Sequence, residues 1–87
     1  MSNTPKVLPT LHSNGTSQKM LADGYDLAAD KLYDFAKAWG AIEFNARDYY
    51  VQGPDAWTAA LEEREAVNAK IREIKNYLDG MREHLHA

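Results

Sequence analysis

The most regular part of the sequence is residues 54–86, PDAWTAALEEREAVNAKIREIKNYLDGMREHLH. Apolar residues recur there at alternating spacings of three and four, interrupted only by Arg64, which is the period of a helix with one apolar stripe. The stripe consists of Trp57, Ala60, Val67, Ile71, Ile74, Leu78, Met81 and Leu85. Gly53, Pro54 and Asp55 are a typical helix start, with proline at the first helical position and an acid in the first turn. The pattern predicts a helix of about 50 Å.

A second helix is predicted over residues 17–44. Its apolar stripe follows an a/d heptad pattern and consists of Leu21, Tyr25, Ala28, Leu32, Phe35, Trp39 and Ile42. The preceding Asn14-Gly15 pair is a turn signal, and Thr16 or Ser17 supplies an N-cap oxygen. The nine-residue connection, residues 45–53, makes the two helices antiparallel neighbours.

The predicted fold class is therefore all-α: a long antiparallel helical hairpin over residues 17–87, preceded by an extended arm over residues 1–16 that carries Pro5 and Pro9. A chain of 87 residues without cysteine has no disulfide to stabilise a small core. Two helices joined along one stripe leave apolar surface uncovered. A homo-oligomeric bundle is the expected solution, and a hairpin covered by its own arm is the alternative.

Composition excludes several classes of function. The chain has 10 basic and 13 acidic residues, which argues against general nucleic-acid binding. It has no apolar run of the ~20 residues that span a membrane, and residues 1–10 lack a signal-peptide pattern. We therefore expect a cytoplasmic protein without membrane contact. The sequence gives no reason to expect a cofactor.

Catalytic and metal-binding patterns are absent from the sequence. Ser13 and Ser17 have no evident His and Asp partners, and there is no cysteine nucleophile. His84 and His86, two residues apart on a helix, cannot face the same side, and His12 stands alone. We predict no metal site and no enzyme activity.

The connection between the helices is the first candidate binding site. Arg47 offers a planar fork for phosphate or carboxylate, Tyr49 and Tyr50 offer rings for stacking, and Asn45 offers a polar edge. These side chains suit a small nucleotide. Alternatively, the loop packs on itself, with Asn45 capping the first helix and Arg47 paired with a nearby acid.

The start of the first helix is the second candidate. Backbone amides at a helix N-terminus attract anions, and polar side chains surround them here: His12, Asn14, Thr16, Ser17 and Lys19. An ordinary capped helix start explains the same residues. In a hairpin of about 40 Å the two candidates lie at opposite ends. They can meet if the arm folds back along the hairpin, or across an antiparallel subunit interface.

Arg64, inside the apolar stripe of the second helix, is expected to extend toward solvent or to pair with an acid. A charged residue in such a stripe can also fix the register of an assembly.

Three segments together resemble short helical proteins encoded by phages and prophages: LPTLHSNGTS at residues 8–17, NARDYY at 45–50 and GPDA at 53–56. Short phage proteins built on helical hairpins include nucleotide "sponges", which form oligomers and sequester cyclic-nucleotide or ADP-ribose-type signals of bacterial immunity. The similarity to the sponges is one of size and expected architecture. The Phe-Asn-Pro-Ser-like loop of the hairpin sponges is absent, so no binding residue is transferred from them.

The resemblance implies a phage-type counter-defence protein that binds and sequesters a small anionic nucleotide without catalysis, in the cytoplasm of a host bacterium. The alternatives are a protein-interaction module that blocks a host protein through its helical faces, and a small structural phage component.

Overall fold

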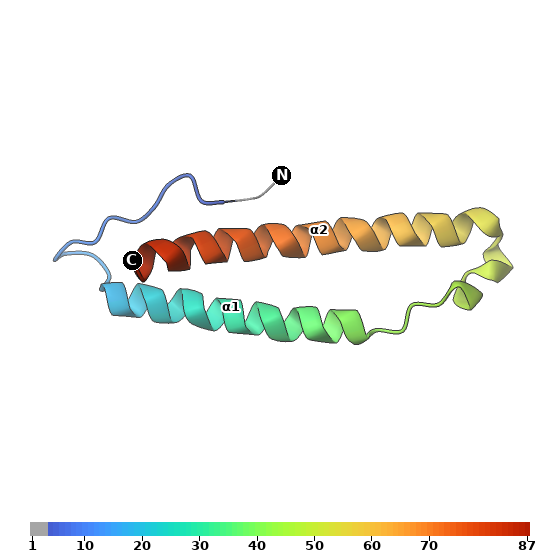
Figure 1. Cartoon of the computed structure of the whole chain (residues 1–87), viewed down its shortest axis with the longest axis horizontal. Coiled ribbons are helices and arrows are strands. Elements are labelled where there is room, and N and C mark those ends of the chain that lie inside the picture. Colours follow the sequence, from blue (N-terminus) through green and yellow to red (C-terminus); the bar gives the residue numbers. More distant parts are fainter. Residues whose placement is uncertain (1–3) are drawn as a thin grey trace.

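The structure is a computed structural model that describes residues 4–87, and it consists of two long antiparallel helices (Figure 1). Helix α1 spans Gln18–Ala41 and α2 spans Pro54–Leu85, with short 3-10 helices η1 (Ala46–Asp48) and η2 (Tyr50–Gln52) between them. The molecule measures 62 × 23 × 18 Å. The predicted all-helical hairpin is confirmed, whereas residues 1–3 of the predicted arm lie outside the described residues.

The helix starts are where the sequence placed them. Ser17 caps α1, its hydroxyl accepting a hydrogen bond from the Met20 amide at 3.2 Å. A turn precedes it, closed by the Gly15 amide and the His12 carbonyl. Helix α2 begins at Pro54, after Gly53 with φ of 108°, a conformation that residues with a side chain rarely adopt. Local turn and capping chemistry therefore sets both starts.

Helix α1 ends three residues before the predicted end at residue 44. Ile42 is extended, with φ −63° and ψ 128°, and its amide donates to the Trp39 carbonyl. This exit from the helix carries Phe44 to the first turns of α2, where its ring centroid lies 4.7 Å from that of Trp57. The prediction that Asn45 caps this helix is wrong, because Ile42 occupies the C-cap.

The face of α1 that packs on α2 is rotated relative to the predicted stripe, of which Leu21, Tyr25, Leu32 and Trp39 stay half-buried. Ala22 is buried, and Ala29 and Ala36, one and two heptads further on, are half-buried between the helices. Side chains this small let two helices approach closely. The alanines therefore face α2, and three residues of the two predicted stripes are left half-exposed in the single chain. They are Phe35 (51% exposed), Ile42 (53%) and Ile74 (49%).

Residues 4–17 contain no helix or strand and pass over the C-terminal end of α2 (Figure 1). The Pro9 carbonyl lies 3.0 Å from His84 Nε2. Pro5 lies against Gly80, where an added Cβ would overlap the proline ring. This segment therefore covers the last turns of α2, where Met81 and Leu85 are buried, and leaves the rest of the hairpin open.

Candidate functional site

Tyr49 is part of an aromatic cluster at the closed end of the hairpin. Its ring centroid lies 5.8 Å from that of Phe44 and 5.7 Å from that of Trp57. Aromatic pairs at these separations are favourable, so the Tyr49 ring is held by its own chain. The self-packed interpretation of the loop therefore describes Tyr49 well.

Arg64 completes this cluster from α2. Its guanidinium carbon lies 4.5 Å from the Trp39 ring centroid and 4.7 Å from that of Phe44. Its Nη2 donates at 3.1 Å to the Trp39 carbonyl near the end of α1, which also accepts from the Ile42 amide. The expected acidic partner is replaced by two ring faces and a carbonyl, so Arg64 joins the helices at this end.

Arg47 and Tyr50 differ from Tyr49 because they remain accessible. Arg47 is exposed and has no ion pair among residues 4–87, and Tyr50 is 65% exposed. Asn45 is half-buried beside them, and its carbonyl accepts from the Asp48 amide. We call Asn45, Arg47 and Tyr50 the hairpin tip. It presents one cation and one ring to solvent.

The residues predicted at the other end are partly engaged within the chain. Ser17 is the N-cap, and Lys19 Nζ lies 2.6 Å from Asp23 Oδ2 in an exposed pair that raises the lysine pKa. The side chains of His12, Asn14 and Thr16 are exposed, with the His12 ring next to Gly15.

The two predicted groups lie at opposite ends of α1, whose 24 residues span about 36 Å. Residues 4–17 follow the C-terminal turns of α2 and do not reach the hairpin tip (Figure 1). Within one chain the structure therefore keeps the two groups apart.

Polar contacts join the two helices at the open end of the hairpin, where α1 begins and α2 ends. Asp26 on α1 accepts from Arg82 Nε at 2.8 Å and lies 3.0 Å from His86 Nε2. Gln18 donates to the Leu85 carbonyl at 2.6 Å, near the last turn of α2. The hydrogen bond from Arg82, followed by that from His86, holds the pKa of the Asp26 carboxyl below its ordinary value.

We expect this carboxylate to give the hairpin an acid-sensitive end. Because the Asp26 pKa is lowered on folding, its contribution to stability is complete above pH ~4 and is lost as pH falls through the folded pKa. Asp26→Asn lacks that contribution at neutral pH, so its urea midpoint should fall less than that of the wild type between neutral pH and pH ~2. Asp34→Asn, at an exposed carboxylate of α1, is the control and should retain the wild-type acid response. An acid response of Asp26→Asn equal to the wild type would contradict the assignment.

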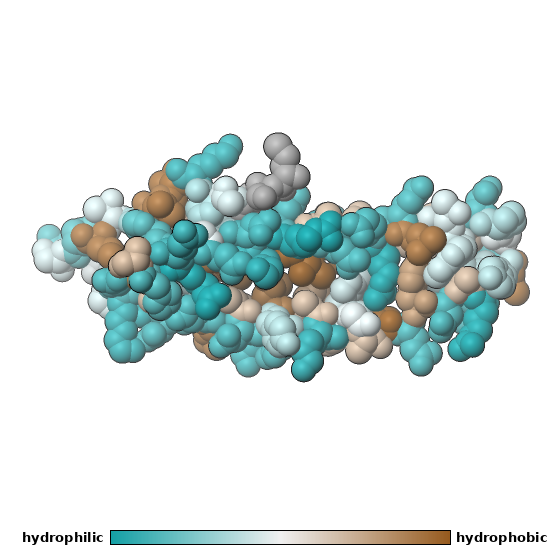
Figure 2. All heavy atoms as spheres, in the orientation of Figure 1, coloured by the Kyte–Doolittle hydropathy of each residue, from teal (hydrophilic) through white to brown (hydrophobic). Residues whose placement is uncertain are grey.

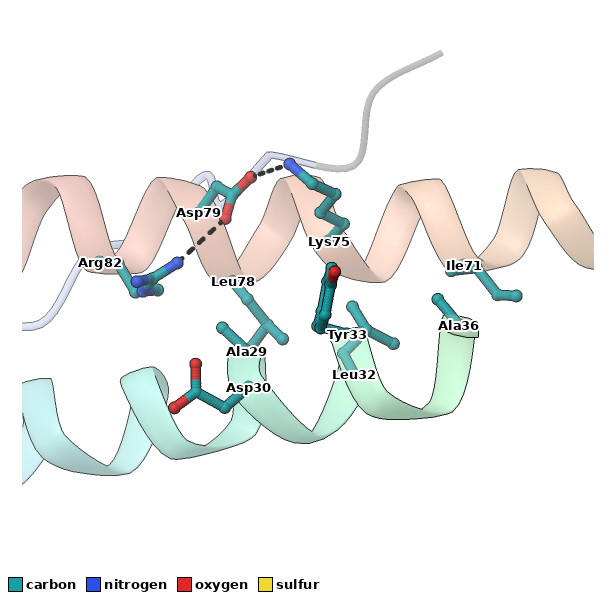
Figure 3. Close-up of a pocket in the computed structure, with 10 residues that line it drawn as sticks. All are labelled: Ala29, Asp30, Leu32, Tyr33, Ala36, Ile71, Lys75, Leu78, Asp79 and Arg82. Carbon is teal, nitrogen blue, oxygen red and sulfur yellow. Dashed lines mark hydrogen bonds and ion pairs between the residues drawn. The ribbon is translucent and has the colours of Figure 1, made fainter. Parts of the chain in front are cut away.

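A groove with a volume of about 440 Å³ lies between the helices. Apolar side chains from both helices line it, namely Ala29, Leu32 and Ala36 from α1 and Ile71 and Leu78 from α2 (Figure 3). Polar and charged side chains stand along its edges, namely Asp30, Tyr33, Lys75, Asp79 and Arg82. Figure 2 shows the result, apolar atoms in a gap bordered by hydrophilic side chains.

Two structural features create this groove. The alanine side chains at 29 and 36 are too short to fill the space between the helices, so the larger side chains of α2 remain accessible from one side. Ion pairs hold the charged side chains at the α2 edge, since Lys75 Nζ lies 2.6 Å and Arg82 Nη1 3.5 Å from the Asp79 carboxylate (Figure 3). The apolar stripes of the two helices do not predict this groove. The heptad spacing of Ala22, Ala29 and Ala36 is the signal that would have revealed it.

Neither a metal site nor a membrane span is found in residues 4–87. No three histidine or acidic side chains there are grouped so as to hold a metal ion. Neither helix combines the length and the apolar character needed to cross a membrane. No protein-family model, curated protein or solved structure matches this chain.

Proposed function

We propose that this chain acts by binding another protein, as a helical interaction module without catalytic activity. The groove between α1 and α2 is the observation that carries the proposal. Its apolar floor is open to solvent along one side of the hairpin, and residues 4–17, which contact α2 near Gly80 and His84, are not among its lining residues. An uncovered apolar groove with polar edges is typical of a protein-binding surface.

An amphipathic helix is the partner that suits this groove best. The groove is bounded by a helix on each of two sides, so it encloses a small molecule poorly but accommodates the apolar face of a third helix. Its edges carry Asp30 and Asp79 beside Lys75 and Arg82, so the partner helix should flank its apolar residues with charges of both signs. Blocking a host protein in this way is the role we propose.

A charge placed in the groove floor should abolish partner binding. Ala36 is half-buried in the floor, and Ala36→Lys puts an ammonium group where the partner's apolar side chains would lie. Ala66→Lys is the matched control, since Ala66 is exposed on α2 and is not among the groove residues. In pull-downs from bacterial lysate, a stoichiometric partner should be retained by the wild type and Ala66→Lys and lost by Ala36→Lys. A partner retained equally by both variants would count against the groove.

A second candidate function rests on the hairpin tip. Arg47 has no ion pair among the described residues and Tyr50 is 65% exposed, so the same loop offers solvent a cation for phosphate and a ring for stacking. These are the groups that a small anionic nucleotide requires, as a phage-type counter-defence protein of the bacterial cytoplasm would use. In a homo-oligomer with antiparallel chains, Asn14 and Thr16 of one copy would complete the pocket of another.

Nucleotide binding of this kind should depend on Arg47. In calorimetry with cyclic dinucleotides, cyclic trinucleotides and ADP-ribose derivatives, Arg47→Ala should weaken binding at least about tenfold, because a charge-assisted hydrogen bond to phosphate is lost. Lys70→Ala, at an exposed cation of α2, should bind as the wild type does. The absence of binding by the wild type across this panel would eliminate the candidate.

A further inference from the structure

Helix α1 carries a second apolar ridge that nothing in the described chain covers. Ala28, Phe35 and Ile42 are spaced by seven residues, so they follow one another along the same line of the helix surface. Ala28 is exposed, Phe35 is 51% exposed and Ile42, which directly follows the helix, is 53% exposed. We call these three residues the outer ridge. It is distinct from the alanine ridge of Ala22, Ala29 and Ala36, which contacts α2.

The outer ridge lies on the side of the hairpin opposite the groove. Tyr33 lines the groove, and Phe35 lies two residues further along α1, about 200° around the helix axis. On α2, the half-exposed Ile74 lies about 140° from Asp79 at the edge of the groove and about 40° from Leu78 in its floor. Ile74 is therefore turned away from the edge of the groove, and a partner in the groove would leave the outer ridge of α1 uncovered.

The accessible surface of the chain is larger than that of a compact monomer of the same mass. The chain exposes 6720 Å², whereas a compact monomer of its 9.8 kDa exposes about 5,200 Å². The difference, about 1,500 Å², exceeds the ~800 Å² that each partner buries in a stable interface of standard size. The chain, with its exposed segment 4–17 included, therefore has enough spare surface to bury one such interface.

We infer that a second copy of this chain packs antiparallel on the outer ridge and forms a four-helix bundle. This inference rests on the homo-oligomer proposed above and names the surface that builds it. In an antiparallel pair centred on Phe35, the two phenylalanines meet and the small Ala28 faces the large Ile42 of the partner at both ends. A parallel pair would instead place alanine on alanine and isoleucine on isoleucine. Only the antiparallel arrangement alternates small and large side chains, as close packing requires.

This arrangement also changes what lies beside the hairpin tip. Because the α1 helices run in opposite directions, the tip of each copy points toward the N-terminal end of its partner's α1. The accessible Arg47 and Tyr50 of one copy then approach the end that carries Asn14 and Thr16 in the other. The two groups of polar residues that lie apart in one chain come together at each end of the dimer.

Sedimentation equilibrium of the full chain tests the interface. The wild type should sediment with twice the chain mass at micromolar concentration. Phe35→Glu should raise the dimer dissociation constant at least about 100-fold, because it puts two carboxylates at the centre of the interface. Tyr33→Glu replaces a comparably exposed ring on the groove side of the same helix and should leave the dimer intact. A monomeric wild type, or a Phe35→Glu variant as dimeric as the wild type, overturns the inference.

Crosslinking tests the orientation without relying on the folding of Phe35→Glu. The chain has no cysteine, so Ala28→Cys and Ile42→Cys can be mixed and oxidised as the only thiols present. The antiparallel dimer should give a disulfide between the two variants and none within either variant alone. Disulfides formed by each variant alone would overturn the antiparallel arrangement. Failure of the groove proposal is separate, because it is measured by Ala36→Lys on a dimer that remains intact.

Discussion

Leu85→Ala should lower the free energy of unfolding by about 3 kcal/mol, within the range measured for leucine truncations in protein cores. Leu85 is the most buried large side chain among the described residues, with 1% of its surface exposed. Its carbonyl also accepts the Gln18 hydrogen bond that ties α2 to the start of α1. A cavity at this position should loosen both helices at the open end of the hairpin.

The matched control is Leu61→Ala on the same helix. Leu61 is 45% exposed, so the same truncation removes little buried surface and should cost less than about 1 kcal/mol. Urea unfolding followed by circular dichroism at one fixed protein concentration gives both values, which keeps any contribution from self-association constant. Equal losses at Leu85 and Leu61 would mean that the C-terminal turns of α2 do not pack as the structure has them.

The existence of the two helices could be predicted because local signals agree with the apolar period. The Ser17 cap and Pro54 mark the two starts, and both lie within one residue of the predicted positions. The end of α1 could not be predicted in the same way. The chain leaves the helix at Ile42 because Phe44 packs on Trp57, and that contact depends on α2 being folded beside it.

The face of α1 that contacts α2 was harder to predict than the helix itself. The a/d stripe and the alanine ridge of Ala22, Ala29 and Ala36 lie next to each other on one helix. Larger residues dominate any hydrophobicity pattern, so the pattern favours the stripe with Phe35 and Ile42 as the internal contact. In the structure the smaller side chains face α2, and those larger residues remain half-exposed on the outer ridge.

The predicted site residues show a similar limit. Loop composition identified aromatic and polar side chains around Arg47, and the structure packs one of them, Tyr49, against Phe44. It could not distinguish Tyr49, held by Phe44 and Trp57, from Tyr50, which is open to solvent. Tyr49 lies between η1 and η2, whereas Tyr50 is the first residue of η2.

Arg64→Ala should lower the free energy of unfolding by about 2 kcal/mol. The guanidinium stacks on the rings of Trp39 and Phe44, and half-buried cation–π contacts contribute about 1 kcal/mol each. The variant also loses the hydrogen bond from Nη2 to the Trp39 carbonyl, which retains the Ile42 amide as a donor. The closed end of the hairpin should therefore loosen without leaving this carbonyl unpaired.

Two further variants separate the planar stack from the positive charge. Arg64→Lys keeps the charge but lacks the planar fork, so it should recover less than half of the lost stability. Arg72→Ala is the control, because Arg72 lies two turns along α2 in an exposed pair with Glu65 and should change the urea midpoint little. Near-ultraviolet circular dichroism reports on the packing of the two tryptophans, Trp39 and Trp57, and Trp39 also donates through Nε1 to Asn68 at 2.7 Å. Arg64→Ala should weaken that signal and Arg72→Ala should not, because Arg64 contacts the Trp39 ring whereas Arg72 pairs with Glu65. An unchanged tryptophan signal in Arg64→Ala would contradict the stacked arrangement.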